Sequence, residues 1–408
     1  MKGRYFFNTF AKVLSIFNHI ALNKQTIRFS TLEEHMKFSS LVKSVITGLA
    51  VTALCAPAFA ADTIKMGVAG AHSGDLASYG LPTVNAAKIV AEKFNAAGGV
   101  NGKQVELLIQ DEQCKPEQAT NVATKLISDG ANIVLGHICS GATKAALPIY
   151  TEGNIIAMSP SATNPMLTQS GDYPTFFRTI ASDDMQARLG VDFAIDKLGA
   201  KRIAVIHDKG DYGKGYAEFA KKFIEEGGKA EVVMFEGITP GAPDYSAVVQ
   251  KIRRNKADVV IYGGYHPEAS KLITQMRKKR IKIDFVSDDG VKDNTFIKVA
   301  GKNAEGVYAS GPIDVSNLPL YKEAIAAHVE KFGSEPGAFY PAAYAAAVAM
   351  LTAIERADST DLAAITEKLR SEPVDTPVGK IKFNERGDAV GVGFSMYQVQ
   401  NGKYVELK

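Results

Sequence analysis

Short apolar runs alternate with helical stretches along most of this chain, and each run ends at a turn rich in Gly, Ser, Thr or Asp. The clearest case is residues 135–163, LGHICSGATKAALPIYTEGNIIAMSPSAT, where we expect a strand at 132–136, a helix at 141–151 and a second strand at 155–159. Apolar runs this short, bounded by turns, are typical of strands buried on both faces of a parallel sheet. The pattern therefore predicts an α/β protein.

Hydroxyl side chains follow both of these expected strands. Ser140 comes after the first strand, and the turn Ser161-Ala162-Thr163 comes after the second. Ligands of open α/β sheets bind at the carboxyl ends of strands, where a helix N-terminus offers N–H groups to an anion. Neither turn contains Lys or Arg, so the expected anion is as small as a carboxylate. Ser and Thr are also common helix caps, and either turn alone is open to that interpretation.

A second series of strands, loops and helices begins at residue 202 and predicts a second parallel sheet. Its expected strands are 202–207, 231–235, 258–263 and 284–287, and its expected helices are 216–226, 246–254 and 267–279. Tyr212, Tyr265 and Asp289 follow these strands. A carboxylate flanked by aromatic rings suits an ammonium group, although Asp289 alone could be a solvated turn or a helix cap. Anion binders in one half and a cation binder in the other predict a zwitterionic ligand.

Two further aromatic residues are candidates for this site. Tyr79 ends the loop before an expected helix at 82–97, and it is either over the sheet edge or an ordinary surface residue. Phe339 begins an expected helix at 338–357, preceded by one at 319–332, and it either faces the cleft or packs in the core. The sequence GVAGAHSG fits neither common nucleotide-binding loop, so no nucleotide is expected.

The first 60 residues differ from the rest. Residues 36–60 have the parts of a secretory signal: Lys37, an apolar run at 45–54 that is too short to span a bilayer, and the cleavage site Ala58-Phe59-Ala60. We expect the exported protein to begin at Ala61. Residues 1–35 precede a complete signal and are either a mis-assigned start or an extension.

Charge excludes some partners. Residues 1–60 hold 7 of the 47 Lys and Arg and 2 of the 44 Asp and Glu, which leaves 40 basic and 42 acidic residues in the exported part. This balance gives no reason to expect nucleic acid or an anionic membrane surface as a partner.

Three roles are considered for the cysteines: a disulfide, a nucleophile and a lipid anchor. Cys114 and Cys139 remain after export and are most simply a disulfide, which over about 25 residues would stabilise the fold by roughly 3 to 4 kcal/mol. The alternative is Cys139 as a nucleophile with His137 as its base. Cys55 raises the question of a lipid anchor, but a good cleavage site follows it.

The motifs GHICSGAT, SPSAT, DKGDYGKG, YGGYHPE and SDDG together resemble those of the periplasmic leucine/isoleucine/valine-binding proteins, the receptors of ABC importers, and the resemblance covers residues 62–408. It implies a type I periplasmic binding fold: two doubly wound parallel-sheet lobes joined by a multi-strand hinge that closes on the ligand. The first lobe is expected at 62–181 and 311–392, and the second at 182–310 and 393–408.

The resemblance also implies roles for single residues. Ser140, Ser161 and Thr163, with Ala162 in their turn, would hold the α-carboxylate, and Thr163 and a backbone carbonyl would also reach the α-ammonium. Asp289 stands where the best-known members carry Glu, one methylene longer. Six residues would line the side-chain pocket: Tyr79, Ile138, Cys139, Tyr212, Tyr265 and Phe339. The family has the disulfide as well, matching Cys114 and Cys139.

The expected function is that of a periplasmic receptor, a monomer without cofactor or metal, that passes a free L-amino acid such as leucine, isoleucine or valine to an ABC permease. One alternative is a ligand-sensing domain of a chemoreception or signalling system. The other is an exported hydrolase, although the sequence contains no GxSxG or HExxH motif and its seven His are scattered.

Overall fold

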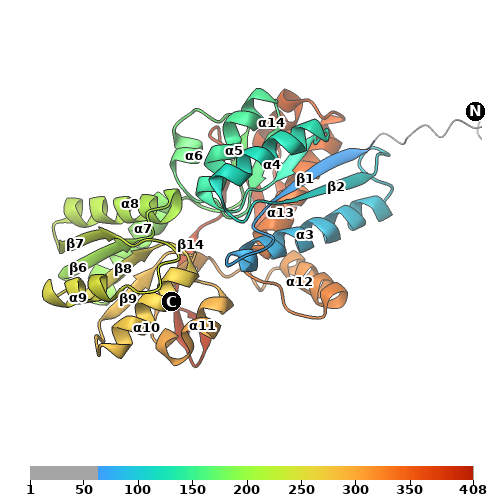
Figure 1. Cartoon of the computed structure of the whole chain (residues 1–408). Coiled ribbons are helices and arrows are strands. Elements are labelled where there is room, and N and C mark those ends of the chain that lie inside the picture. Colours follow the sequence, from blue (N-terminus) through green and yellow to red (C-terminus); the bar gives the residue numbers. More distant parts are fainter. Residues whose placement is uncertain (1–62, 408) are drawn as a thin grey trace, which may run out of the picture. The chain divides into compact units, whose positions relative to one another are not determined.

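The computed structural model describes residues 63–407, so the expectations for residues 1–35 and for the signal at 36–60 lie outside the described part. Two sheets organise these residues, each with helices on both faces (Figure 1). The expectation of an α/β protein with two parallel-sheet lobes is confirmed. The residue boundaries of the lobes remain a prediction.

The first sheet has five parallel strands in the order β2-β1-β3-β4-β5. Its strands are β1 (Ile64–Gly70), β2 (Val105–Asp111), β3 (Ile133–Leu135), β4 (Ile156–Ser159) and β5 (Phe176–Arg178). The helices between them are α3 (Ala77–Ala96), α4 (Pro116–Ser128), α5 (Ser140–Glu152) and the short α6 (Met166–Gln169).

The second sheet has seven strands in the order β15-β14-β10-β9-β8-β6-β7. They are β6 (Arg202–His207), β7 (Glu231–Gly237), β8 (Val259–Gly263), β9 (Asp284–Ser287), β10 (Tyr308–Pro312), β14 (Phe394–Gln400) and β15 (Lys403–Glu406), and the last two run antiparallel to their neighbours. Its helices are α7 (Asp183–Asp192), which continues as a π-helical turn to Lys197, α8 (Asp211–Gly227), α9 (Ser246–Arg254), α10 (His266–Lys278) and α11 (Asn294–Ala300) with a 3₁₀ turn at Gly301–Ala304.

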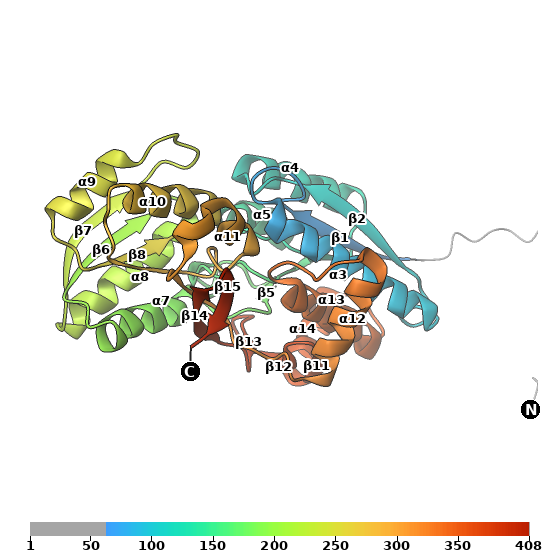
Figure 2. The same cartoon turned by 90° about the horizontal axis from the view of Figure 1, so that it is seen from below.

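The C-terminal part returns to the first sheet. It contains α12 (Pro319–Phe332), α13 (Tyr340–Ala357), α14 (Leu362–Ser371) and the small sheet β11 (Val374–Thr376), β12 (Gly379–Phe383) and β13 (Ala389–Val390). Figure 2 shows this sheet beside α13 and α14, with which it makes contacts. The chain thus passes between the two sheets after β5, after β10 and after β13, which is the multi-strand connection expected of a hinge.

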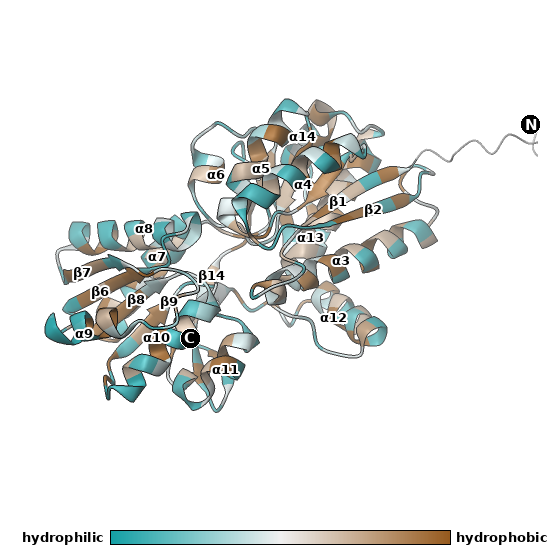
Figure 3. Cartoon of the chain, in the orientation of Figure 1, coloured by the Kyte–Doolittle hydropathy of each residue, from teal (hydrophilic) through white to brown (hydrophobic). Residues whose placement is uncertain are grey.

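Alternating side chains of the parallel strands fill separate cores on the two faces of each sheet. In β3, Ile133 and Leu135 pack with α3 and α13, whereas Val134 packs with α4 and α5. In β6, Ala204 and Ile206 pack with α9 and α10, and their neighbours face α7 and α8. Figure 3 shows the same pattern as apolar strands beneath helices with hydrophilic outer faces. Burial on both faces explains why the strands are continuous apolar runs.

Helices α3 and α8 begin several residues earlier than the sequence pattern predicts. Helix α3 starts at Ala77 and contains Pro82 inside it, which places Tyr79 in the first turn of a helix rather than in a loop. Helix α8 starts at Asp211, so Tyr212 lies in its first turn.

Helix α7 (Asp183–Asp192) is a further difference, because no helix is expected between the first series of elements and residue 202. Residues 176–178 form β5, and Ser182 then precedes a helix that begins with Asp183 and Asp184. Ser182 is the N-cap residue and is extended, and its side chain makes no capping hydrogen bond. The two acidic residues of the first turn place negative charge at the positive end of the helix.

A disulfide joins Cys114 and Cys139, with their Cα atoms 5.5 Å apart. It ties the end of β2 to Cys139, which directly precedes α5. The expected pairing is confirmed, and the interpretation of Cys139 as a nucleophile is excluded because a bonded sulfur cannot attack. Among residues 63–407, no helix has the length and apolarity needed to cross a membrane.

Replacing both cysteines, Cys114→Ala together with Cys139→Ala, is expected to lower the free energy of unfolding by about 3 to 4 kcal/mol. The reason is that the disulfide closes a loop of 25 residues in the unfolded chain. Urea unfolding of residues 61–408, followed by circular dichroism, measures the change. Reductant should bring the parent to the stability of the double variant and leave the variant itself unchanged; a variant as stable as the oxidised parent would contradict the prediction.

Candidate functional site

The N-terminus of α5 forms one side of the candidate site. Cys139 precedes the helix in an extended conformation, and Ser140 is its first residue. The first N–H groups of a helix have no acceptor within it, so this helix start presents donors and the positive end of its dipole. Ser140 is buried, and its Oγ accepts a hydrogen bond from Asn164 N at 3.3 Å. The hydroxyl proton of Ser140 therefore remains available for a ligand.

The turn Ser161-Ala162-Thr163, after β4, lies beside this helix start. Ser161 Oγ donates to Ile138 O at 2.8 Å, and Ala162 N donates to Ser159 Oγ at 2.9 Å. These bonds join the ends of β3 and β4 into one rim. Thr163 is buried, and its Oγ1 has no hydrogen-bond partner among the described residues. The rim therefore offers an unused hydroxyl.

Asp289, after β9, supplies a carboxylate from the second sheet. It is 2% exposed, and its Oδ1 accepts a hydrogen bond from Tyr212 Oη at 2.6 Å. Tyr212 Oη in turn accepts from Gly290 N at 2.8 Å, which fixes both side chains. Oδ2 of Asp289 has no partner among the described residues. One oxygen is thus held in place while the other is free to accept.

Aromatic rings surround this carboxylate. The Tyr212 and Tyr265 ring centroids are 5.1 Å apart, and Tyr79 lies 5.8 Å from Tyr265 and 5.9 Å from Phe339. Tyr79 comes from α3 beneath the first sheet, and its Oη lies 2.6 Å from His266 Nδ1 at the start of α10. The cluster therefore joins side chains from both lobes.

Most of the predicted site residues line one small cavity, whose volume of about 10 Å³ leaves room for no more than a water molecule. Its lining is Tyr79, Ile138, Ser161, Tyr212, Tyr265, Asp289, Gly290 and Phe339. Ser140, Ala162 and Thr163 lie in the adjoining rim and not in this lining, and Cys139 packs in the core beneath α5. Asp289 and Phe339 also border a wider cleft of about 780 Å³.

Two other buried carboxylates accompany Asp289. Asp183, the first residue of α7, is fully buried, and neither of its carboxylate oxygens has a hydrogen-bond partner among the described residues. Asp288 accepts from Gly264 N at 2.7 Å with one oxygen only. Gln186, on the next turn of α7, is also buried with an unpartnered amide. Such groups are costly to bury, so this concentration marks a place where a ligand supplies the missing charge.

The pKa values of the three carboxylates are all raised, as expected for buried acids that lack a positive partner. Burial, and then the charge of Asp289, raise the pKa of Asp183 well above its usual value, while the charge of Arg178 lowers it to a smaller extent. Burial and the charges of Asp289 and Asp183 raise the pKa of Asp288 in the same way. Burial raises the pKa of Asp289 to about 6, against the hydrogen bond from Tyr212. A cation placed among these groups would lower all three pKa values.

Asp183 and Gln186 are the residues that sequence reasoning missed. The signal that could have found them is Ser182-Asp183-Asp184, which predicts the start of α7 directly after β5. Asp183 N donates to Thr163 O at 2.9 Å, so the start of this helix lies against the hydroxyl-rich turn.

His137 has a structural environment. Its Nε2 lies 2.9 Å from Tyr150 Oη, its Nδ1 is 3.5 Å from Glu112, and all three residues are buried. In the part of the chain from 63 to 407, no group of His, Cys, Asp and Glu is arranged to hold a metal ion.

Comparison with known proteins decides the family. The sequence profile of the family described as periplasmic binding protein matches residues 63–403. This chain is a periplasmic binding protein. A leucine-, isoleucine-, valine-, threonine- and alanine-binding protein of Pseudomonas aeruginosa is 35% identical to it, over 89% of this chain and 96% of the relative.

Solved structures of other periplasmic binding proteins have the same fold. A leucine-binding protein from Thermotoga maritima is 27% identical, with a TM-score of 0.78 over 85% of this chain and 98% of its own. A branched-chain amino acid transporter substrate-binding protein from Streptococcus pneumoniae, solved with isoleucine, is 27% identical, with a TM-score of 0.76 over 85% of this chain and 100% of its own.

Replacing Asp289 by Asn should stabilise the ligand-free protein at pH 7.5 by about 2 to 3 kcal/mol. A folded-state pKa of about 6 lies above the unfolded value of 3.8, so the stability contributed by the protonated form is present at low pH and lost as the pH rises through 6. Asn keeps an oxygen that accepts from Tyr212 and carries no charge. Urea unfolding at several pH values measures the effect.

This stability difference between parent and Asp289→Asn should shrink towards zero below about pH 4, where the parent carboxyl is protonated in both states. Asp375→Asn, at an exposed position, is the matched control and should leave stability unchanged. An Asp289→Asn protein that is less stable than the parent at pH 7.5 would contradict the prediction.

Proposed function

We propose that this periplasmic binding protein captures free branched-chain or other small apolar L-amino acids between its two lobes and delivers them to the permease of an ABC importer. The observation that carries the proposal is the pairing of a helix start and hydroxyl-rich rim in one lobe with a buried, unpartnered carboxylate in the other. An amino acid has one charge for each side.

The ligand carboxylate is assigned to the rim of the first lobe. Ser140 and the first N–H groups of α5 supply donors, and Ser161 and Thr163 supply hydroxyls beside them. A helix start and neutral donors bind a carboxylate without a buried Lys or Arg at the same point.

The ligand ammonium is assigned to Asp289, Asp183 and the Thr163 hydroxyl. All three are buried, and each has at least one acceptor atom that is unpartnered among the described residues. An ammonium group has three donors and one positive charge, which match this set. The second carboxylate also offsets the shorter reach of Asp289 relative to the Glu expected for the family, since Asp183 approaches from α7 rather than from the strand end.

The ligand side chain is assigned to the space between the aromatic rings and Ile138, which has to widen from its volume of about 10 Å³ to admit it. Tyr79, Tyr265 and Phe339 form most of this wall, and no Lys or Arg lines the pocket. An apolar wall favours leucine, isoleucine and valine over charged amino acids, but one methylene there is worth only about 1 to 3 kcal/mol. The expected selectivity is therefore for a class of side chains.

The names of the relatives support a role in amino-acid transport. The relative from Pseudomonas aeruginosa is named for leucine, isoleucine, valine, threonine and alanine, and the Streptococcus pneumoniae protein is described as part of a branched-chain amino acid transporter. We assign a monomer exported to the periplasm as the working form, with an ABC permease as partner.

Calorimetric titration of residues 61–408 with each of the twenty amino acids tests the proposal. The branched-chain amino acids should bind most tightly, and the charged ones at least about a hundredfold more weakly, because their side-chain charge would be buried unpaired. Isopentylamine, which lacks the carboxylate of leucine, and 4-methylpentanoate, which lacks its ammonium, separate the two halves of the site. Each should bind at least about a hundredfold more weakly than leucine, and equal binding by either would overturn the assignment of two charged subsites.

Affinity for leucine should fall about tenfold between pH 7.5 and pH 5. The ligand ammonium lowers the pKa of Asp289 from about 6, so the complex is fully favoured above pH 6 and is weakened as protons compete below it. Asp183 and Asp288 act in the same direction, because burial raises the pKa of each. Isothermal calorimetry across this pH range measures the change.

Asp289→Ala is the control for this pH dependence. It should cost about 2 to 5 kcal/mol of binding free energy at pH 7.5, since it leaves the ammonium without a main partner. It should also reduce the pH dependence to the part that comes from Asp183 and Asp288. A variant with the parent's affinity and pH profile would remove Asp289 from the site.

A further inference from the structure

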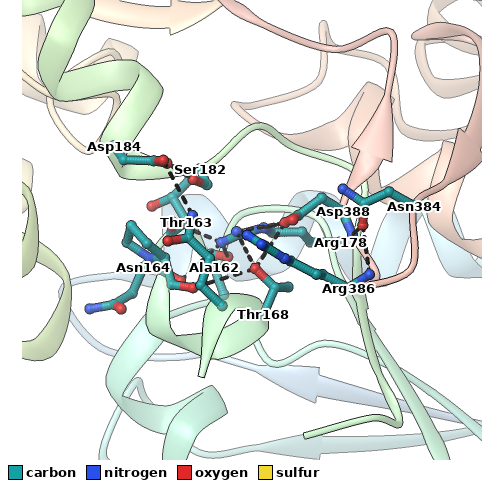
Figure 4. A network of polar contacts seen from close by, with 12 residues as sticks. Ala162, Thr163, Asn164, Thr168, Arg178, Ser182, Asp184, Asn384, Arg386 and Asp388 are labelled. Atoms are coloured by element: carbon teal, nitrogen blue, oxygen red, sulfur yellow. Dashed lines mark hydrogen bonds and ion pairs between the residues drawn. The ribbon is translucent and has the colours of Figure 1, made fainter. Parts of the chain in front are cut away.

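Arg178, the last residue of β5, is 0% exposed and among the largest fully buried side chains of the described residues. Its guanidinium lies behind the hydroxyl-rich turn and outside the pocket lining (Figure 4). Nη1 donates to the carbonyl oxygens of Ala162, Thr163 and Asn164 at 3.3, 2.8 and 3.0 Å. A single cation thus holds three consecutive carbonyls of the turn.

Asp388, from the turn between β12 and β13, neutralises this cation. Arg178 Nε donates to Asp388 Oδ1 at 2.6 Å, and Nη2 donates to Thr168 Oγ1 at 2.8 Å. Asp388 is itself fixed, because its N–H donates to Asn384 Oδ1 at 3.0 Å, and the backbone of Arg178 bonds to Gly387 O at 3.0 Å. The ion pair therefore joins the binding turn to a segment 210 residues away in the sequence.

The direction of the carbonyls sets the direction of the amides. The peptide bonds of this turn are trans, so each N–H points opposite to the carbonyl of the same peptide unit. With Ala162 O on the guanidinium, the N–H of Thr163 points away from it, and this N–H has no acceptor among the described residues. With Thr163 O on the guanidinium, Asn164 N–H points to Ser140 Oγ, to which it donates.

We propose that Arg178, neutralised by Asp388, is a positioning residue for the carboxylate subsite: it orients the turn so that Thr163 N–H and the Ser140 hydroxyl face the ligand carboxylate. This inference rests on the proposed function. Arg178 touches no ligand atom. Its positive charge also polarises the peptide groups and strengthens the donors on their far side.

Lysine does not replace arginine here. The guanidinium is planar and has five donors in fixed directions, and the contacts to the three carbonyls, Thr168 and Asp388 use all three of its nitrogens. An ammonium group is a single point with three donors, so it leaves part of this set unpaired. Arg178→Lys therefore keeps the charge and removes the geometry.

The first test compares Arg178→Lys with Arg277→Lys by calorimetry, using the amino acid that the parent binds most tightly in the panel of twenty. Arg277 is a matched control: it also donates to two backbone carbonyls, of Ile281 and Ile283, at the end of α10 opposite to Tyr265. Arg178→Lys should weaken binding at least tenfold, and Arg277→Lys should change it by less than twofold. A parent that binds no amino acid defeats the proposed function itself, and this inference with it.

The second test separates positioning from general support of the fold. The ¹³C resonance of the ligand, labelled at its carboxyl carbon, reports hydrogen bonding at the carboxylate. It should shift in the complex with Arg178→Lys and match the parent in the complex with Arg277→Lys. A double-mutant cycle combines Arg178→Lys with Ser140→Ala. The double variant should lose less affinity than the product of the two single fold-losses, since both residues act on one subsite.

Asp388→Asn provides the same measurements if Arg178→Lys does not fold. The amide oxygen of this variant would still accept from Nε, but the buried cation would be left without a neutralising charge. A loss of affinity with a changed carboxyl resonance is again expected. Parent-like affinity and an unchanged resonance in the folded variants would overturn the proposal. Failure of both variants to fold would also overturn it, because Arg178 would then support the whole lobe.

Discussion

The site is dominated by three buried carboxylates that lack full hydrogen-bond partners. Keeping them away from water costs free energy in the ligand-free protein. Asp183, Asp288 and Asp289 are buried together, the charge of Asp289 raises the pKa of both others, and several of their oxygens have no partner among the described residues. A fold selected only for stability would pair or neutralise these groups. Their persistence is understandable if a ligand brings the positive charge, so that stability is lowered in the free protein and recovered on binding.

The rim assigned to the ligand carboxylate, at the start of α5 and the turn 161–163, is built differently. Covalent and hydrogen bonds within the protein hold its donors in place without a ligand. The Cys114–Cys139 disulfide anchors the residue that precedes α5, and Ser159 and Ser161 bond to the backbone of the neighbouring strand end. Arg178 then holds the following turn from behind. Donors that are already in place lose little conformational entropy on binding. Neutral donors held rigidly therefore suffice for a carboxylate in a rim without Lys or Arg.

Local sequence pattern predicts much of this fold and only part of the site. The apolar runs predict β6 and β9, and the helical periodicity predicts α9 and α12, with the bounds that the structure has. Ser140, Thr163 and Asp289 are visible because they follow such runs. Asp183 is missed because no helix is expected directly after residues 176–178. Arg178 is hidden for a stronger reason: its role depends on Asp388, and no local pattern links residues so distant in sequence.

The direct polar contacts between the lobes contribute little to the stability of the closed arrangement. Lys144 Nζ lies 2.8 Å from Asp211 Oδ1, but both side chains are largely exposed, and such pairs contribute at most about 1 kcal/mol. Asn164 Nδ2 donates to Asp211 O at 2.6 Å, and Tyr79 Oη lies 2.6 Å from His266 Nδ1. The net contribution of such hydrogen bonds is small, because the same groups bond to water when the site is open. The free-energy cost of burying the Asp289 carboxylate opposes these weak favourable contacts. These contacts alone therefore favour closure only weakly. Under the function proposed above, the charges of the zwitterionic ligand decide closure, because a ligand shifts such an equilibrium only by its differential affinity for the closed state.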